Sequence, residues 1–171
     1  MAITQRGSVL SASDAVASDL FGGAVAISGN GLVMAVGASA RDTFSTNAGG
    51  VYIYDRSGSA WVQRGSVLQA SPSPGYEFYG TSVALNSDGT VLAVGAPEWW
   101  HDPDAYYGAV FVYDWNGSAW VLRSTVGTDI NPADNKDFGS VIALSGNGLV
   151  LAVNDFSDKS FYIFDWTGSA W

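Results

Sequence analysis

The chain contains no cysteine and a single histidine among its 171 residues. A disulfide framework, a zinc knuckle and a thiol nucleophile are therefore excluded. Lysine and arginine together number only 7 against 16 acidic residues, which gives a formal net charge of −9. Because phosphate binding needs clustered basic side chains, this balance argues against a nucleic-acid partner.

Long apolar stretches are also missing. No run approaches the roughly 18 consecutive apolar residues that a membrane-spanning helix needs, so we expect no membrane insertion. The residues after Met1 lack a charged segment followed by an apolar one, so we expect no signal peptide here. The motifs of a nucleophile elbow, a P-loop and a zinc protease are absent, so we expect no enzyme and no cofactor.

Glycine (21 residues) and aromatic residues (7 Trp, 8 Tyr and 8 Phe) are abundant, which is typical of short strands and tight turns. The tetrapeptide Gly-Ser-Ala-Trp occurs three times, and its copies end at Trp61, Trp120 and Trp171. Self-similarity at a fixed period indicates a repeat architecture. We interpret residues 1–171 as one domain, with repeats covering approximately 3–61, 62–120 and 121–171.

Each repeat shows the pattern of four antiparallel strands. In the first repeat the strands are expected at residues 24–27, 32–36, 51–55 and 61–68. An Asn-Gly or Asp-Gly turn joins the first two strands, as in a tight hairpin. The second strand is apolar on both faces, which indicates a strand packed between two layers.

A four-stranded sheet cannot bury both of its faces alone, so the repeats must pack on one another. Four-stranded sheets arranged around an axis form a β-propeller, which is the fold class that we predict: all-β, with three blades in this chain. A linear β-solenoid and a two-sheet sandwich are the alternatives. We expect Trp61 and Trp120 to fill gaps between neighbouring blades, because burying such a ring removes about 150–250 Å² from water.

The repeats also share an aromatic-Gly pair followed by a Gly-Ala pair. These motifs are Phe21-Gly22 with Val36-Gly37-Ala38-Ser39, and Tyr79-Gly80 with Val94-Gly95-Ala96-Pro97. They resemble the FG-GAP repeat of the integrin α-subunit propeller and of bacterial and algal surface proteins. The third repeat departs from the pattern, since Asn154-Asp155-Phe156 replaces the Gly-Ala-Pro segment. The resemblance implies a β-propeller with a protein-binding or adhesion role, extracellular or at the cell surface.

Integrin-type repeats carry a calcium loop between their first two strands, and this chain departs from that pattern. Calcium needs several oxygen ligands converging on one centre. The equivalent turns here are short and contain at most one carboxylate, Asp88. We therefore expect no metal site, and the sequence is similar to a short-turn variant of the family.

Residues 3–10 match the start of the second repeat, since Arg6-Gly7-Ser8-Val9-Leu10 recurs as Arg64-Gly65-Ser66-Val67-Leu68. This suggests a fourth strand that completes the third blade of a partner chain. We expect a homo-oligomer, with a homodimer that forms a six-bladed propeller favoured. The expected closure residues are Ile3, Gln5, Val9, Leu10, Phe161, Ile163 and Trp171. The alternative is a fragment or an engineered piece of a larger propeller.

One loop, at residues 97–107, is rich in aromatic and acidic side chains. Loops on a rigid scaffold often bind ligands, so we expect a protein or glycan site there. Its candidate residues are Trp99, Trp100, His101, Asp102, Asp104, Tyr106 and Tyr107. The alternative interpretation is a loop whose aromatic side chains cover the edge of a blade.

Three functions follow from these patterns. The first is a non-enzymatic FG-GAP module for protein binding or adhesion, and the second is a carbohydrate-binding propeller that uses the loop at 97–107. The third is a largely structural assembly module. A glycan array with the wild type and Trp100→Ala distinguishes the carbohydrate-binding function from the other two.

Overall fold

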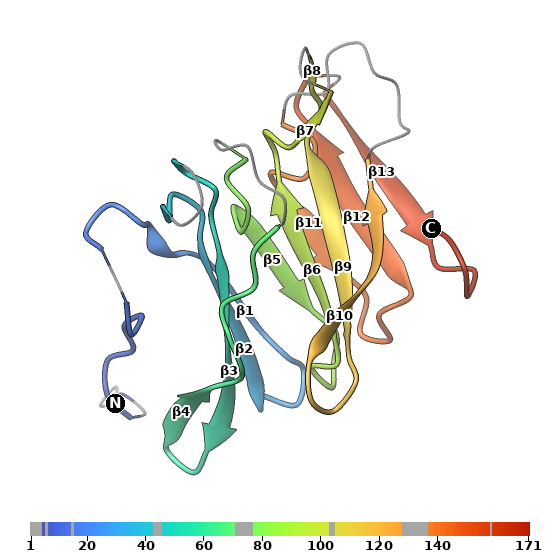
Figure 1. Cartoon of the computed structure of the whole chain (residues 1–171). Coiled ribbons are helices and arrows are strands. Elements are labelled where there is room, and N and C mark those ends of the chain that lie inside the picture. Colours follow the sequence, from blue (N-terminus) through green and yellow to red (C-terminus); the bar gives the residue numbers. More distant parts are fainter. Residues whose placement is uncertain are drawn as a thin grey trace, which may run out of the picture.

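The computed structural model describes residues 5, 7–14, 16–42, 46–70, 77–102, 105–127, 137–157 and 159–171. For residues 100–102, 105 and 106 it describes the backbone alone. All regular secondary structure in these ranges is β, arranged in three main antiparallel sheets of four, four and three strands. Figure 1 shows the sheets side by side, with the second between the other two.

The first sheet is a meander in which each strand pairs with the next. It consists of β1 (Phe21–Ile27), β2 (Val33–Ala38), β3 (Val51–Ser57) and β4 (Ala60–Gln63). The expected fourth strand over 61–68 is interrupted: β4 ends at Gln63, and one isolated bridge joins Leu68 to Val51. Gly65 lies at a φ of 71° between these two parts, a left-handed conformation that breaks the strand.

The second and third sheets repeat this order. The second consists of β5 (Ser82–Leu85), β6 (Val91–Ala96), β9 (Ala109–Trp115) and β10 (Trp120–Val126). The third consists of β11 (Ile142–Leu144), β12 (Val150–Asp155) and β13 (Ser160–Asp165). Between β6 and β9, a two-stranded ribbon of β7 (Trp100–Asp102) and β8 (Ala105–Tyr106) lies in the loop at 97–107.

The hairpin turns between the first two strands of each sheet confirm the prediction from the Asn-Gly and Asp-Gly pairs. Gly31, Gly89 and Gly148 have φ values of 69°, 74° and 71°. Each of these turns is closed by a side chain that accepts from the start of the following strand, such as Asn86 Oδ1 from the Val91 N–H at 2.9 Å. The three repeats therefore fold locally in the same way.

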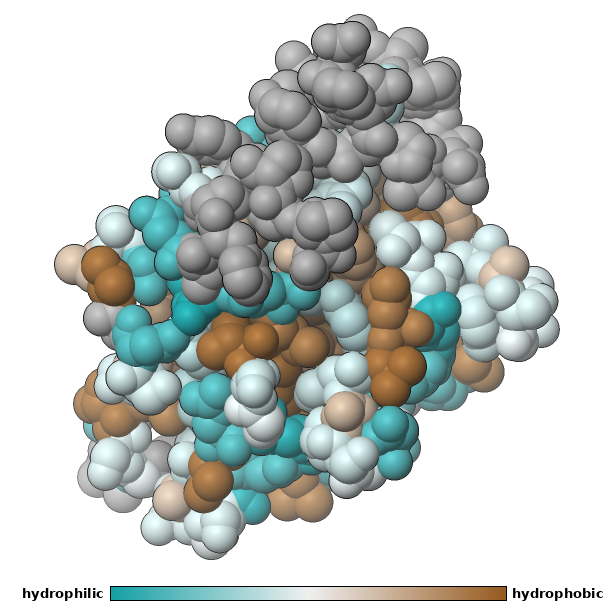
Figure 2. Space-filling model, in the orientation of Figure 1, coloured by the Kyte–Doolittle hydropathy of each residue, from teal (hydrophilic) through white to brown (hydrophobic). Residues whose placement is uncertain are grey.

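Two hydrophobic cores lie between the sheets. Ile53 of the first sheet and Leu92 of the second are fully buried in one core, and Val112 and Leu151 are fully buried in the other. The central strand β6 is buried on both faces, as its apolar sequence predicted. Apolar side chains also remain on the surface, where Figure 2 shows brown patches separated by hydrophilic residues.

The first strands of the three sheets, β1, β5 and β11, lie next to one another. Within the described residues the sheets do not close into a ring. The first and third sheets therefore each have an outer face, turned away from the second sheet. The two junctions between sheets and these two outer faces together make up the candidate functional site.

Candidate functional site: the sheet junctions and the outer faces

Both junctions depend on a glycine at the end of the second strand. A Cβ atom on Gly37 would lie 2.0 Å from the carbonyl oxygen of Gly80 in the next sheet. A Cβ atom on Gly95 would lie 2.0 Å from the carbonyl oxygen of Gly139. Since the clashing atom is backbone in both cases, any larger residue would push the next sheet away.

A second glycine, just before the third strand of the sheet, also contacts the aromatic-Gly turn of the next sheet. A Cβ atom on Gly49 would lie 2.1 Å from the Tyr79 carbonyl oxygen, and one on Gly108 would lie 2.4 Å from that of Phe138. The rings of Tyr79 and Phe138 are fully buried. The aromatic-Gly motif therefore inserts a turn of one sheet into a notch that two glycines of the preceding sheet leave open.

The residue before each aromatic has an unusual backbone conformation. Leu20, Phe78 and Asp137 have φ values of 57°, 52° and 89°. Non-glycine residues rarely adopt this left-handed region, and they do so where the surrounding structure holds them. This conformation recurs in all three sheets. The turn that contains the aromatic-Gly pair, here called the docking turn, therefore has the same backbone geometry in each sheet.

An arginine links the sheets at the other end of each junction. Arg64 pairs with Asp55 of its own sheet, with 2.9 Å between Arg64 Nε and Asp55 Oδ2. Its guanidinium group donates to the Gly89 carbonyl oxygen of the next sheet at 3.4 Å and lies over the Trp115 ring, 4.7 Å from the centroid. One side chain thus contacts a carboxylate on one sheet and an aromatic face on the next.

The second junction repeats this arrangement. Arg123 pairs with Asp114 at 2.9 Å between Nε and Oδ2, and donates to the Gly148 carbonyl oxygen at 3.0 Å. Its guanidinium carbon lies 5.2 Å from the centroid of Trp166. Sequence reasoning missed this element, although an Asp-Arg pair nine residues apart recurs in both repeats.

The repeated tryptophans lie close to these arginines. Trp120 packs against the core between the first and second sheets, and Trp171 packs against the core between the second and third. Trp120 also contacts Trp115, with 5.5 Å between ring centroids. Trp120 therefore fills the gap between neighbouring sheets, as predicted.

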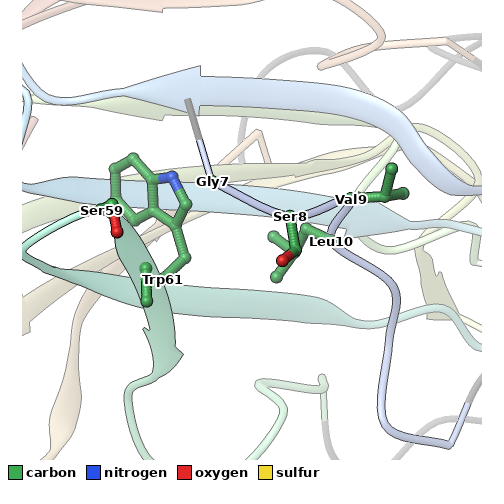
Figure 3. Close-up of a pocket in the computed structure, with 7 residues that line it drawn as sticks. Gly7, Ser8, Val9, Leu10, Ser59 and Trp61 are labelled. Atoms are coloured by element: carbon green, nitrogen blue, oxygen red, sulfur yellow. The ribbon is translucent and has the colours of Figure 1, made fainter. Parts of the chain in front are cut away.

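Residues 7–10 lie on the outer side of the first sheet. Together with the Ser59–Trp61 hairpin they line a cavity of about 200 Å³ (Figure 3). An equivalent cavity of about 310 Å³ lies between residues 64–68 of the first sheet and the Ser118–Trp120 hairpin of the second. Residues 7–10 thus sit against the first sheet as residues 65–68 sit against the second.

Asp14 anchors the segment that follows. Its carboxylate accepts from the Tyr52 hydroxyl at 2.6 Å and from Arg41 Nη2 at 2.5 Å. These two hydrogen bonds lower the pKa of Asp14. Burial, followed by the hydrogen bond to Asp14, raises the pKa of Tyr52 to about 12.

The outer face of the first sheet remains partly open. Val25 and Ile27 on β1 are 54% and 56% exposed, whereas their equivalents on β5, Val83 and Leu85, pack against the core shared with the first sheet. Among the expected closure residues, Val9 is exposed, Gln5 is exposed, and Leu10 packs on the core beneath this face. Ile3 lies outside the described residues. The described part of the expected strand over 3–10 forms no strand within this chain.

The outer face of the third sheet is more exposed. Phe161 and Ile163 on β13 are 69% and 63% exposed, while their equivalents Val51 and Ile53 in the first sheet are fully buried. Trp171 is partly buried against the core with the second sheet. The closure residues of β13 are thus accessible for contact with another molecule or segment.

This third face lacks both glycines of the internal junctions. Asn154 stands where Gly37 and Gly95 stand, and Lys159 stands where Gly49 and Gly108 stand. These equivalences follow from the strand register, since Val51, Val110 and Phe161 pair with Gly37, Gly95 and Asn154. Lys159 keeps the left-handed conformation of its glycine counterparts, with a φ of 53°.

The loop at 97–107 is described only in part. The Trp99 ring packs edge-on against Phe111, with 4.8 Å between centroids and an interplanar angle of 78°. Its backbone carbonyl accepts from the Tyr107 N–H at 3.1 Å, which closes the base of the ribbon. These contacts give Trp99 a packing role. Asp104 and the side chains of Trp100, His101, Asp102 and Tyr106 lie outside what the structure describes.

The carboxylate of Asp88, the only one in the three hairpin turns, closes its own turn. Its Oδ1 atom accepts from the Thr90 N–H at 3.1 Å and from the Thr90 hydroxyl at 2.5 Å. The hydrogen bond from the hydroxyl lowers the pKa of Asp88. Across the described ranges, three or more metal-ligating side chains are nowhere gathered together.

Comparisons with known proteins agree with this repeat geometry. Residues 5–54 match the family model described as FG-GAP repeat, which confirms the resemblance expected from the sequence. No curated protein matches the chain. Among solved structures, the fold is similar to a chain in the complex of KlAtg21 with the coiled-coil of AgAtg16. That match has 15% identity and a TM-score of 0.57, and it covers 84% of this chain and 39% of that one.

Residues 5–54 therefore match one FG-GAP repeat, and the chain spans about two fifths of the length of the solved chain that it matches. Identity this low shows a shared fold and nothing of function. None of the described residues forms a helix long and apolar enough to cross a membrane.

Proposed function

We propose that this chain is a non-enzymatic protein-interaction module of FG-GAP type. Its three sheets are three blades of a β-propeller, and the outer face of the first sheet docks another repeat of the same type. The observation that carries this proposal is the place of residues 7–10. They lie against the first sheet as the last segment of the first sheet lies against the second.

The docking turn of the first sheet supports the proposal. Leu20 and Gly22 have φ values of 57° and 89°, close to the 52° and 92° of Phe78 and Gly80 at the first internal junction. A turn already held in the docking conformation pays no further conformational entropy on binding. The first sheet is thus preorganised to enter the glycine notch of a preceding repeat.

The exposed side chains of β1 support it as well. Val25 and Ile27 occupy the positions at which Val83 and Leu85, both partly buried, pack against the core between the first and second sheets. Covering two such aliphatic side chains stabilises a contact by about 1.5–3 kcal/mol each when burial is complete. A preceding repeat would therefore continue the same core outward.

A binding experiment in which two chains can meet at one junction alone, the third sheet of one on the first sheet of the other, tests this function. The probe is a second copy of the chain that carries N154G and K159G, which create the glycine notch, and V25E and I27E, which block its own first sheet. Native mass spectrometry of this probe with the wild type should show a one-to-one complex. Its mass should be close to twice the 17.9 kDa of one chain.

The control is the same probe mixed with a V25E/I27E target, which should give no complex. A second target, V62E, alters an exposed valine on β4 away from β1 and should bind as the wild type does. Absence of a complex between the probe and the wild type would contradict the proposed function. The homodimer expected from the sequence stays a separate prediction, which the mass of the wild type alone tests.

A further inference from the structure

We propose that the third sheet ends the series of repeats on its side. Asn154 and Lys159 keep a further FG-GAP-type repeat, including the first sheet of a second copy, off this outer face. The inference rests on the proposed function, because it concerns the docking of like repeats. Under this inference a like repeat docks on the first sheet and is sterically excluded from the third, so docking occurs at one end of the module.

The position of Asn154 provides the first argument. At both internal junctions, a Cβ atom in this place would lie 2.0 Å from the backbone carbonyl oxygen of the incoming turn. Asn154 has that Cβ atom and two further polar groups beyond it. Its Oδ1 atom accepts from the Val141 N–H of its own sheet at 2.5 Å, which holds the side chain in place. The incoming turn could not dock without a shift of its backbone.

Lys159 provides the second, independent argument. Its glycine counterparts lie at a φ of 84° in Gly49 and 64° in Gly108, and Lys159 lies at 53°. The backbone therefore keeps the notch geometry, but Lys159 carries a Cβ atom where both counterparts have none. A Cβ atom here would lie 2.1–2.4 Å from the carbonyl oxygen of the incoming aromatic residue. The lysine ammonium group would also have to leave water or find a partner.

Along β13 this face resembles an internal junction, although the third sheet has no fourth strand. Phe161 and Ile163 are large and apolar, at positions that are fully buried at the first junction. Their exposed surface would favour docking of an apolar sheet. The two notch residues separate the β12–β13 part of this face from the matching faces of the first and second sheets, each of which accepts a following turn. Steric exclusion of a competing partner is a recognised route to specificity.

A consequence follows for the six-bladed ring expected from the sequence. A ring of two copies needs the third sheet of each copy to dock on the first sheet of the other, so the excluded junction would occur twice. The wild-type chain therefore cannot close this ring in the register of its internal junctions. A repeat that docks on its first sheet must come from a partner with glycine at both notch positions.

Sedimentation velocity over a range of concentrations tests the inference on three proteins. These are the wild type, N154G/K159G, and the matched control N154Q/K159R, which keeps both side chains bulky. We expect N154G/K159G to self-associate at least about a hundredfold more tightly than the wild type. The control should behave as the wild type. Circular dichroism and thermal unfolding check that each protein is folded.

The outcomes separate the inference from the proposed function. If the wild type associates as tightly as N154G/K159G through contacts that V25E/I27E abolishes, the inference is overturned and the proposed function stands. If N154G/K159G does not associate and the four-substitution probe does not bind the wild type, the docking of like repeats itself fails. If N154Q/K159R associates as N154G/K159G does, the two side chains are not the determinant and the inference fails.

Discussion

The guanidinium group of Arg64 lies over the ring of Trp115, with 4.7 Å between the guanidinium carbon and the ring centroid. The two residues belong to different sheets, and Arg64 is held in this place by Asp55 of its own sheet. A cation over an aromatic face is attracted to it, and the planar guanidinium group suits both contacts at once. This pair is therefore a polar fastening between the two sheets, beside their apolar and glycine contacts and hydrogen bonds such as that from Asn30 Nδ2 to the Asp88 carbonyl oxygen at 3.2 Å.

Arg64→Ala should lower the free energy of unfolding by about 2 kcal/mol. The loss combines the aromatic contact, at about 0.5–1 kcal/mol, with a charge-assisted pair to Asp55 and the packing of the side-chain stem. Arg64→Lys should recover less than half of it, because an ammonium group cannot make both contacts in the same geometry. Chemical denaturation of the variants, followed by tryptophan fluorescence, measures the effect.

Arg56→Ala is the matched control, because the Arg56 side chain donates from Nε to the Gly58 carbonyl oxygen of its own sheet at 3.1 Å. Its effect should stay within about 0.5 kcal/mol. Arg123→Ala should resemble Arg64→Ala, since Arg123 makes the same set of contacts at the second junction. An Arg64→Ala cost no larger than that of Arg56→Ala would show that the fastening has no energetic role.

Gly95→Ala should destabilise the chain by about 4 kcal/mol or more, or prevent folding. The added Cβ atom would lie 2.0 Å from the Gly139 carbonyl oxygen, and a backbone atom cannot move aside without shifting the third sheet. Gly146→Ala is the control, because its Cβ atom would approach only the flexible side chain of Ser87, at 2.5 Å from the hydroxyl. It should cost about 1 kcal/mol. Similar thermal midpoints for the two variants would contradict the notch geometry.

Much of the local structure followed from the sequence because it depends on short-range chemistry. The hairpin turns were predictable from Asn-Gly and Asp-Gly pairs, since few other residues tolerate the φ of 69° and 71° seen at Gly31 and Gly148. The double-sided burial of β6 was predictable from its unbroken apolar run. The role of Trp120 was predictable from the repeat itself.

The junction chemistry could not be predicted in the same way, because it joins residues that are distant along the chain. Nothing in the local sequence indicates that Leu20 and Phe78 adopt a left-handed backbone, a conformation that non-glycine residues rarely adopt. The sequence could not show either that Trp99 contacts Phe111, a contact that agrees with the alternative in which aromatic side chains of the loop cover a blade edge. The sequence alone shows that Asn154 replaces the glycine of the other repeats. Its steric consequence follows only from the distance between a Cβ atom on Gly95 and the next sheet.

The stability of the chain should fall as the pH rises from about 10 to about 12. Burial raises the pKa of Tyr52 to about 12, so the folded state holds this proton more tightly than the unfolded state does. The resulting stability is complete below pH 10 and is lost as the pH rises through the folded pKa. Thermal unfolding at several pH values across this window measures the loss.

Tyr52→Phe tests the assignment of part of this alkaline loss. Tyr54, Tyr79 and Tyr113 also have raised pKa values, mainly through burial, so they should keep a share of the pH dependence. The variant should therefore show a shallower decline between pH 10 and pH 12, with a lower starting stability because Asp14 loses a hydrogen bond. An unchanged slope would show that Tyr52 does not contribute.

Trp99→Ala should lower the free energy of unfolding by about 3 kcal/mol, because the ring packs edge-on against Phe111 and against the core between the first and second sheets. Trp99→Phe keeps an aromatic ring on Phe111 and should cost only about 1 kcal/mol. Denaturant titration measures both values. The result also distinguishes two roles in the loop at 97–107. Removing a tryptophan that packs on the core lowers stability, whereas removing one that contacts only a ligand costs little stability. A cost for Trp99→Ala below about 0.5 kcal/mol would contradict the packing role and return Trp99 to the set of ligand-binding candidates.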